Sequence, residues 1–531
     1  MLKLKDTLKN RCNNNSRTKN SILNISFGIV GRILSIALNF AVRTVFIYTL
    51  GKEYLGINGL FSSILTMLSL TELGFGTAIN YKLYKPLAEN DEKRVRMLMK
   101  FYKQAYRVVG LAILSLGICL IPTLPFLIKD YGSLQALGIN ATLIFLLHIL
   151  RSTSSYLFFA YRSAVMRANQ QQYILDLIGY VVTILTNITK IIVLVFWGDF
   201  VIYTATVIVF NVIQNLVNAI IAKWYYPQFF EKENENLSKK EIWELLKDCG
   251  ALFVYKVNFV ITKSVGNTVI SAFIGLTSVA LYSNYYLFYT TINGLFDKVY
   301  SAVKASAGNL FATETLEKQY SFFQVMNFLS AILFGTAGAA VAVCADELIT
   351  AWIGSSYVIK QPFAILVGLE ILSHGLRMNL AQVRNLTGAF RQMWFRPIIG
   401  VLINVGISVW LVHIYGIYSI FIGMLTADIL TTFLVDPRII HTYSFNNYRP
   451  VSEYYMKNLL YVGLLFAVCA LDIWLSGLII VNRSWLSVVF HGLLVVITVP
   501  SLFLFLFWKT NECQYLVNIA GGILKKKIKF N

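Results

Sequence analysis

The sequence predicts an all-α integral membrane protein with about 14 transmembrane helices. Hydrophobic residues make up 57% of the 531-residue chain and charged residues only 14%, against roughly 45–50% and about 25% in soluble globular proteins. The apolar residues gather in runs of about 20, the length that a helix needs to cross a bilayer. The basic residues lie between these runs, mainly in alternate connections. Together these observations exclude a string of soluble domains.

The apolar runs give the predicted helices in chain order. The first run follows a basic, polar start and has no small-residue cleavage site, so we expect a span and not a removable signal peptide. A polar segment at 223–247 separates six runs from eight further ones. The first six cover 22–48, 54–81, 104–128, 138–161, 173–197 and 200–222. The last eight cover 248–274, 279–303, 322–345, 362–383, 397–412, 416–436, 458–477 and 484–508.

An even number of spans places both termini on one side of the membrane, and the basic residues indicate which side. Of the 46 Lys and Arg residues, 34 lie in the two tails and the even-numbered connections. The opposite loops contain four, namely Lys52, Lys129, Lys360 and Arg483. Because basic loops stay in the cytoplasm, we expect both termini there. The net charge of +20 then follows from topology, and nucleic acid is not an expected partner.

The predicted outer loops leave no room for a catalytic domain, since the longest has about 16 residues. Six cysteines are widely spaced without a CxxC pair, which indicates neither a disulfide framework nor a zinc site. No strand followed by a glycine-rich phosphate loop is predicted, so an ATP-driven pump is not expected. We therefore expect a transporter and not an enzyme, with no cofactor and no metal. A proton or sodium gradient remains open as its energy source.

An internal repeat organises the spans. Shifting the chain by 224 residues aligns the first span with the seventh and the second with the eighth, which predicts two pseudo-symmetric six-helix lobes. Such repeats are typical of transporters that work by alternating access. The predicted domains are a basic cytoplasmic N-terminus at 1–20, an N-lobe at 21–222, a cytoplasmic amphipathic linker at 223–247, a C-lobe at 248–436, spans 13 and 14 at 437–508, and a basic cytoplasmic tail at 509–531.

Two of the repeated spans carry matching polar stripes. In each, three polar residues are spaced by 7 and 11 positions, which at about 100° per residue puts them within about 20° of one line. A charge inside the bilayer is costly unless it is paired or faces water. If the two stripes face each other, they form a cationic chamber for an anionic substrate. The stripe residues are Arg32, Asn39 and Arg43 on the first span and Lys256, Lys263 and Asn267 on the seventh.

The alternative is that these cations are neutralised within the protein. Glu72 in the second span and Asp297 near the end of the eighth are candidate charge partners. Together with Glu370 and Asp428 they are also candidate proton carriers. Two further basic residues each follow a histidine by three positions and either line the path or bond helix backbones; these pairs are His148 with Arg151 and His374 with Arg377. Lys190 is open to a functional or a structural role, and Arg107 is close enough to a helix end to reach the membrane surface.

Residues 31–110 resemble the opening of the polysaccharide repeat-unit flippases of the multidrug/oligosaccharidyl-lipid/polysaccharide exporter superfamily. The segment EYLGINGLFSSILTMLSLTELGFGTAI is the most specific part, and span order and count agree along nearly the whole chain. The resemblance implies a bacterial inner-membrane flippase that moves undecaprenyl-diphosphate-linked oligosaccharides to the outer leaflet for capsule, exopolysaccharide or O-antigen synthesis. It also implies a V-shaped cavity lined by spans 1, 2, 7 and 8. A polysaccharide polymerase and glycosyltransferases are the implied partners, beside the lipid bilayer.

The related lipid II flippases use cavity arginines on the first span, where Arg32 and Arg43 lie here, and hold the lipid tail in a groove of spans 13 and 14. The seventh span has lysines at the second-lobe positions, which departs from that pattern. Two alternatives remain. A multidrug exporter of the same superfamily would want an acidic chamber for organic cations, and a membrane-bound polysaccharide polymerase or glycosyltransferase would need a larger outer loop.

Overall fold

The computed structural model confirms the all-α prediction. It describes residues 17–72, 75–129, 131–169, 171–231, 233, 235–359, 362–389, 392–393, 395–478 and 485–518, and within these ranges every regular element is a helix. Packing divides the chain into two compact units, Met1–Val279 and Ala280–Asn531. The division falls inside the helix α12 (Leu276–Thr313). Consequently α11 (Lys239–Phe273) packs with the first unit, against α2 (Arg17–Leu68).

The first two predicted spans are joined without a loop. Helix α2 runs from Arg17 to Leu68 and is broken at Gly51, whose φ of 84° suits glycine. The second predicted span then continues through a short 3-10 turn into α3 (Phe75–Ala88). Gly56 lets α2 approach the start of α12 closely, because an added Cβ would lie 2.2 Å from the carbonyl oxygen of Leu276.

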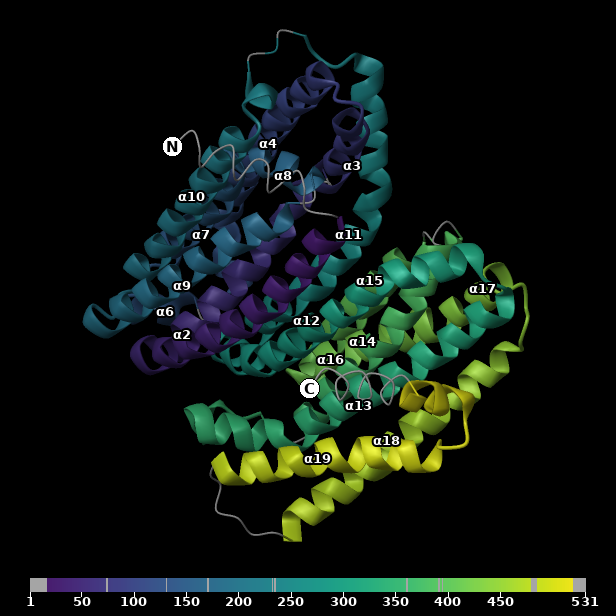
Figure 1. Cartoon of the computed structure of the whole chain (residues 1–531). Coiled ribbons are helices and arrows are strands. Elements are labelled where there is room, and N and C mark those ends of the chain that lie inside the picture. The colour runs from purple at the N-terminus through teal and green to yellow at the C-terminus, as the bar shows by residue number, and fades with distance from the viewer. Residues whose placement is uncertain are drawn as a thin grey trace, which may run out of the picture. The chain divides into compact units, whose positions relative to one another are not determined.

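Four helices form the body of the first unit. Helix α10 (Phe200–Tyr225) packs against α7 (Ala141–Leu157) and α9 (Gln172–Phe196), and both of these pack against α2 (Figure 1). Helix α4 (Glu92–Leu120) covers α7. The chain between α7 and α9 includes the short helix α8 (Ser163–Ala168). Buried side chains of α4 and α8 share one hydrophobic cluster, and Met166 of α8 joins Leu175 of α9 and Ala222 of α10 in a second one.

An ionic clamp holds the linker after α10 onto the start of α4. The ion pairs are Lys93 with Glu235 at 2.5 Å, Arg94 with Glu241 at 2.5 Å and Arg96 with Glu233 at 3.1 Å. The clamp ends at α11, where Ser238 and Glu241 form a reciprocal capping box. The predicted amphipathic linker at 223–247 thus contacts the start of α4.

The second unit is built on two tightly packed helices, α13 (Leu316–Ile353) and α14 (Pro362–Thr387). They approach closely at Gly338 and Gly368, where an added Cβ on either would lie 2.4 Å from the other's carbonyl oxygen. Helices α18 (Val451–Leu478) and α19 (Trp485–Leu506) pack on α13 through an aliphatic and aromatic core. Small side chains at the crossing let the two backbones come into close contact, as in other membrane helix pairs.

A π-helical turn interrupts the last span of the second predicted lobe. Helix α15 (Arg396–Tyr415) is followed by α16 (Tyr418–Ala427), a π-turn at Asp428–Phe433, labelled η7, and α17 (Leu434–Tyr443). A π-turn inserts one extra residue into an α-helix and often marks a functional site.

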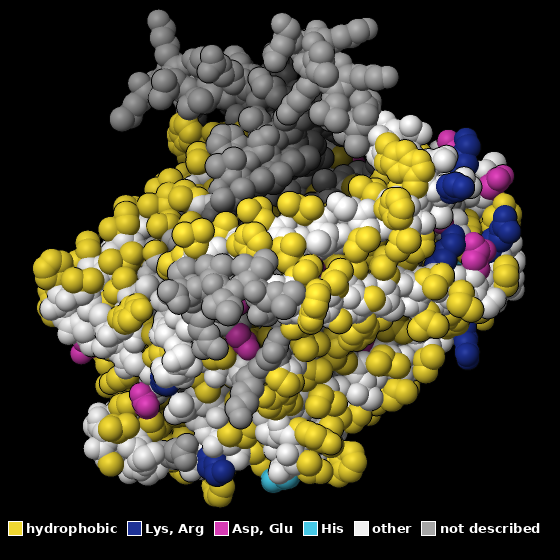
Figure 2. Space-filling view, turned by 90° about the horizontal axis from the view of Figure 1, so that it is seen from below, with side chains coloured by type: hydrophobic (Ala, Val, Ile, Leu, Met, Phe, Trp, Pro, Cys, Tyr) yellow, Lys and Arg dark blue, Asp and Glu magenta, His cyan; other side chains and the backbone are white. Residues whose placement is uncertain are grey.

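The chain is a multi-pass membrane protein. Among the described residues ten helices are long and apolar enough to span a bilayer, and eleven if the bent pair Ala141–Leu157 and Ala160–Ala168 is one span. The prediction was about 14, and each predicted run does contain helix. The first predicted run and part of the second lie in α2 on either side of the break at Gly51, and α11 and α12 carry several charged residues, which lowers their hydropathy. The face drawn in Figure 2 is largely hydrophobic, as expected of a surface that contacts lipid.

Candidate functional site

Two of the six predicted stripe residues have ordinary structural contacts. Asn267 of α11 donates its side-chain amide to the carbonyl oxygen of Gly59 at 3.1 Å and to the hydroxyl of Ser63 at 2.9 Å, both on α2. The exposed Asn39 accepts a hydrogen bond of 3.4 Å from the amide of Asn187. These contacts join helices within the first unit. The side chains of four predicted residues, namely Arg32, Glu72, Lys256 and Lys263, lie outside the described part of the structure.

Arg43, the third residue of the first stripe, belongs to a group of cations around Tyr203. Arg43 comes from α2, Arg151 from α7 and Lys190 from α9, and Tyr203 lies on α10. The Lys190 ammonium lies 5.4 Å from the centre of the Tyr203 ring. Arg43 and Arg151 both interact electrostatically with the Tyr203 side chain, and Arg151 also with Lys190. All three cations are half-buried, so a concentrated positive charge lies within the first unit.

A polar pocket of about 280 Å³ opens beside Arg151. Its walls come from α2, α7 and α10. Apart from Leu65, every lining residue is polar: Ser62, Thr66, Ser69, His148, Arg151, Ser152, Ser155 and Asn211. The two residues His148 and Arg151 that the sequence singled out as path-lining candidates thus lie together at one cavity.

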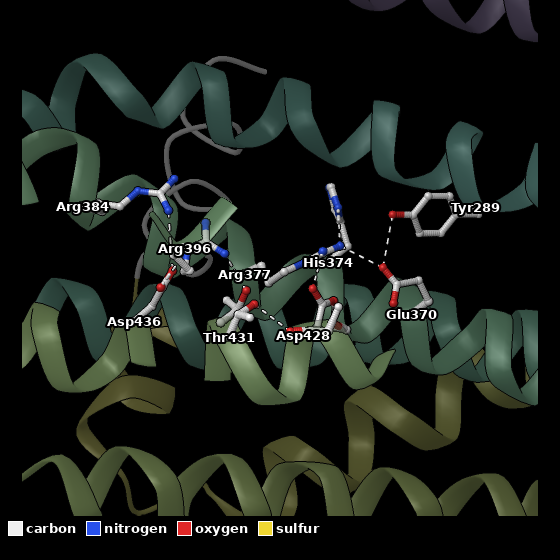
Figure 3. Close-up of polar contacts among 12 residues, drawn as sticks. Tyr289, Glu370, His374, Arg377, Arg384, Arg396, Asp428, Thr431 and Asp436 are labelled. Atoms are coloured by element: carbon white, nitrogen blue, oxygen red, sulfur yellow. Dashed lines mark hydrogen bonds and ion pairs between the residues drawn. The ribbon is translucent and has the colours of Figure 1, made fainter. Parts of the chain in front are cut away.

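A network of ion pairs lies inside the second unit (Figure 3). Arg377 of α14 bridges two carboxylates, Glu370 at 2.9 Å and Asp428 at 2.6 Å. Glu370 is fully buried and also accepts a hydrogen bond of 3.4 Å from the hydroxyl of Tyr289. The Ser373 hydroxyl donates to Asp428. Arg377 is therefore a neutralised cation, which favours the structural interpretation of this residue.

The histidine of the second pair joins the same network. His374 Nε2 lies 3.5 Å from the carboxylate of Asp297, which is exposed on α12. On its other side, His374 Nδ1 lies 3.5 Å from the guanidinium of Arg377. The structure thus brings Asp297, His374 and Arg377 together, and the role of Asp297 as a charge partner of the chamber cations stays a prediction.

A second set of ion pairs lies near Arg384, seven residues after Arg377 on α14. Asp436 of α17 is buried and lies 3.6 Å from Arg384 and 3.0 Å from Arg396. Arg396 also donates to the Thr432 hydroxyl at 2.8 Å. Asp436, Arg384 and Arg396 were not predicted as site residues, because the sequence places the two arginines in a cytoplasmic connection. The sequence does contain a signal for this cluster. Asp436 ends an apolar run, and Arg377 and Arg384 are seven residues apart, which puts them on one helix face.

An apolar groove of about 170 Å³ lies beside this core, between α13, α14 and α18. Small residues of the α13–α14 crossing, including Gly338 and Gly368, form its floor, and Leu465, Phe466 and Ile473 of α18 form its wall. Helix α18 corresponds to predicted span 13, whereas no described residue of α19, the predicted span 14, lines this groove. Within the described residues, no group of three or more His, Cys, Asp or Glu side chains is arranged to hold a metal ion.

No protein-family model and no curated protein matches the chain by sequence. Solved structures do match its fold. The lipid II flippase MurJ in an inward closed conformation has a TM-score of 0.66 at 16% identity, and the match covers 90% of this chain and 99% of that one. A multidrug resistance MATE family transporter of the MOP superfamily, in an inward-facing conformation, has a TM-score of 0.56 at 12% identity over 80% of this chain and 100% of its own.

The Vibrio cholerae MATE transporter VcmN matches with a TM-score of 0.52 at 15% identity, over 80% of this chain and 99% of its own. The chain therefore has the fold that these transporters and the MurJ flippase share.

Proposed function

We propose that the chain is a flippase that moves undecaprenyl-diphosphate-linked oligosaccharide repeat units across the bacterial cytoplasmic membrane by alternating access. The substrate would be taken from the cytoplasmic leaflet and released to the outer leaflet for capsule, exopolysaccharide or O-antigen synthesis. Both termini would lie in the cytoplasm. Glycosyltransferases that build the unit and a polymerase that joins the units are the proposed partners.

The observation that carries this proposal is a charge contrast between the two units. In the second unit, Arg377 contacts two carboxylates. In the first unit, Arg151 and Lys190 lie on membrane helices and form no ion pair with any carboxylate among the described residues. Since an uncompensated charge within a membrane is costly, an anionic substrate is the partner that would balance them.

The rest of the substrate has matching surfaces. The hydroxyl-lined pocket in the first unit suits sugars, which are recognised by hydrogen bonds. The apolar groove along α18 suits a polyprenyl chain. The fold shared with the MurJ flippase at a TM-score of 0.66 supports a lipid-linked substrate. As energy source we propose a proton or sodium gradient, because the sequence predicts no nucleotide-binding domain.

The alternative is a multidrug exporter, which the likeness to MATE transporters supports equally. Organic cations would meet repulsion from Arg151 and Lys190. An exporter of this kind would therefore have to bind its substrates elsewhere in the chain.

A deletion strain tests the proposed function. The lipid-linked unit should accumulate in the inner leaflet, so a membrane-impermeant glycan-labelling reagent should label it in lysed cells but not in intact ones. Wild-type protein should restore labelling on intact cells, Lys190→Gln should restore it poorly, and the matched control Arg107→Gln, an exposed cation of α4, should restore it fully. Labelling of intact deletion cells at the wild-type level would refute the proposal. Drug sensitivity of the same strain without a change in labelling would favour the exporter.

A further inference from the structure

The polar pocket of the first unit has the features of a site that is built for a ligand. Its lining is almost entirely hydroxyl, amide and cationic, although the helices that form it are otherwise apolar. Ionisable side chains inside a membrane protein mark substrate and ion paths, and both Arg151 and His148 line this pocket. The pocket's volume of about 280 Å³ is slightly below the roughly 300–1,000 Å³ of small-ligand sites. It has room for one compact polar group.

His148 supplies an independent observation. Only 1% of its surface is exposed, and neither ring nitrogen has a hydrogen-bond partner among the described residues. Its ring packs against Phe61 and Phe200 at centroid distances of 5.7 Å and 6.2 Å, which fixes its place without satisfying its nitrogens. Leaving a buried polar group unpaired costs about 1–3 kcal/mol. His148 is thus an unsatisfied polar side chain at the edge of the pocket.

Arg151 decides what kind of ligand group suits the pocket. It follows His148 by three positions, so both side chains lie on one face of α7. A guanidinium presents several donors in a plane and pairs best with an oxyanion, to which it can donate two parallel hydrogen bonds. Lys190 adds a second positive charge that interacts with Arg151. The hydroxyls of Thr66, Ser69 and Ser155 donate to backbone carbonyls, so they can accept hydrogen bonds from hydroxyl groups of the same ligand.

We propose that this pocket, with Arg151 and His148, is an oxyanion-binding subsite for a hydroxyl-rich ligand. The inference rests on the proposed function and makes it more specific. Two groups of a lipid-linked oligosaccharide have the required chemistry, the diphosphate and the carboxylate of an acidic sugar. The subsite holds one of these groups in the first unit while the rest of the substrate lies outside the pocket.

Binding to the purified full-length protein in lipid nanodiscs tests the inference. The probes are inorganic pyrophosphate, methyl glucuronide and, as a neutral control, methyl glucoside, each titrated by calorimetry. We expect one anionic probe to bind at least tenfold more weakly to Arg151→Gln, the loss expected for a charge-assisted hydrogen bond. Binding should weaken severalfold in His148→Phe, which keeps an aromatic ring between Phe61 and Phe200. Arg107→Gln should bind as the wild type does.

The pattern of results separates the sources and the proposals. Loss of pyrophosphate binding assigns the pocket to the diphosphate, and loss of glucuronide binding assigns it to a sugar carboxylate. If neither anion binds, or if both variants bind like the wild type, the subsite is refuted. Should Arg151→Gln fail to fold, His148→Phe alone decides. A subsite that fails while the deletion strain still behaves as a flippase mutant refutes only this inference, and anion binding without a flipping defect refutes only the proposed function.

Discussion

Asp428 and Asp436 face the same neighbouring helix although eight residues separate them. Asp428 pairs with Arg377 and Asp436 with Arg384, and these two arginines are seven residues apart on α14. On an unbroken α-helix, eight residues turn by about 800°, so the two acids would point about 80° apart. The π-turn at Asp428–Phe433 absorbs one residue, and seven effective positions bring them to within about 20°. The π-turn therefore sets the register of both ion pairs.

Deleting Leu430 should be tolerated. Leu430 is 46% exposed and lies in the π-turn, so its removal should convert the turn to regular α-helix and leave Asp428 and Asp436 seven residues apart. Both ion pairs should persist, and the thermal unfolding midpoint of the purified protein should stay within about 3 °C of the wild type. Deleting Leu425 from the regular helix α16 is the matched control. It should lower the midpoint strongly, because it turns the preceding residues by about 100°. Equal loss in both deletions would contradict the register argument.

Replacing Arg377 by Met should destabilise the second unit. The substitution leaves Glu370 and Asp428 as buried carboxylates without their cation, and breaking a buried pair costs about 3–5 kcal/mol. Urea or heat unfolding in detergent measures the effect. Arg107→Met removes a cation from an exposed position and should change stability by less than about 0.5 kcal/mol. A loss no larger than that of the control would show that Arg377 contributes nothing to stability.

Alanine at Gly338 or Gly368 should separate α13 from α14. Each added methyl group would lie 2.4 Å from a backbone oxygen, which cannot move aside as a side chain can. We expect a loss of about 1–3 kcal/mol for either substitution. Gly406→Ala and Gly463→Ala are helical controls with no atom within 4 Å of the new methyl group, and they should be neutral or slightly stabilising. If Gly338→Ala unfolds with the same free energy as the wild type, the close crossing of α13 and α14 is excluded.

The ionic clamp should open at acidic pH. The hydrogen bonds from Arg94 and then from Ser238 lower the pKa of Glu241 to about 2, whereas an unfolded Glu titrates near about 4.3. Because the folded pKa is lower than the unfolded one, Glu241 stabilises the clamp fully at pH values above the unfolded pKa. This stabilisation is lost as the pH falls from about 4.5 towards 2. A spin label at the exposed Lys240 should therefore become more mobile over this range. In Glu241→Gln the label should be mobile at every pH. If neither acidic pH nor this substitution changes the mobility of the label, the clamp is contradicted.

Hydropathy was sufficient to predict the helices, because a long apolar segment in a membrane can form all of its backbone hydrogen bonds internally only as a helix. The π-turn at Asp428 could not be predicted, since one extra residue leaves the apolar character of the run unchanged. Nor could the break at Gly51, where a single residue with φ of 84° replaces a loop. Both features depend on what packs against the helix.

Spacing predicted which residues share a helix face but not what lies opposite. Asn267 was expected in a cationic stripe, and its side chain bonds Gly59 and Ser63 of α2 instead of facing an open space. His148 and Arg151 were correctly placed on one face, and the hydroxyl pocket around them required α2 and α10 to be in position. One of the two partners of Arg377, Asp428, is 51 residues away in sequence, and only tertiary packing identifies it.

The π-turn also bears on how sequences of this fold should be compared. A chain with one residue fewer between the counterparts of Asp428 and Asp436 would make the same two ion pairs with a plain α-helix. An alignment scored on hydropathy would have no reason to open a gap in so apolar a stretch. It would then pair Asp436 with a residue one position away and make two equivalent carboxylates look unrelated. Placing a one-residue gap within 428–433 keeps both acids opposite their arginines.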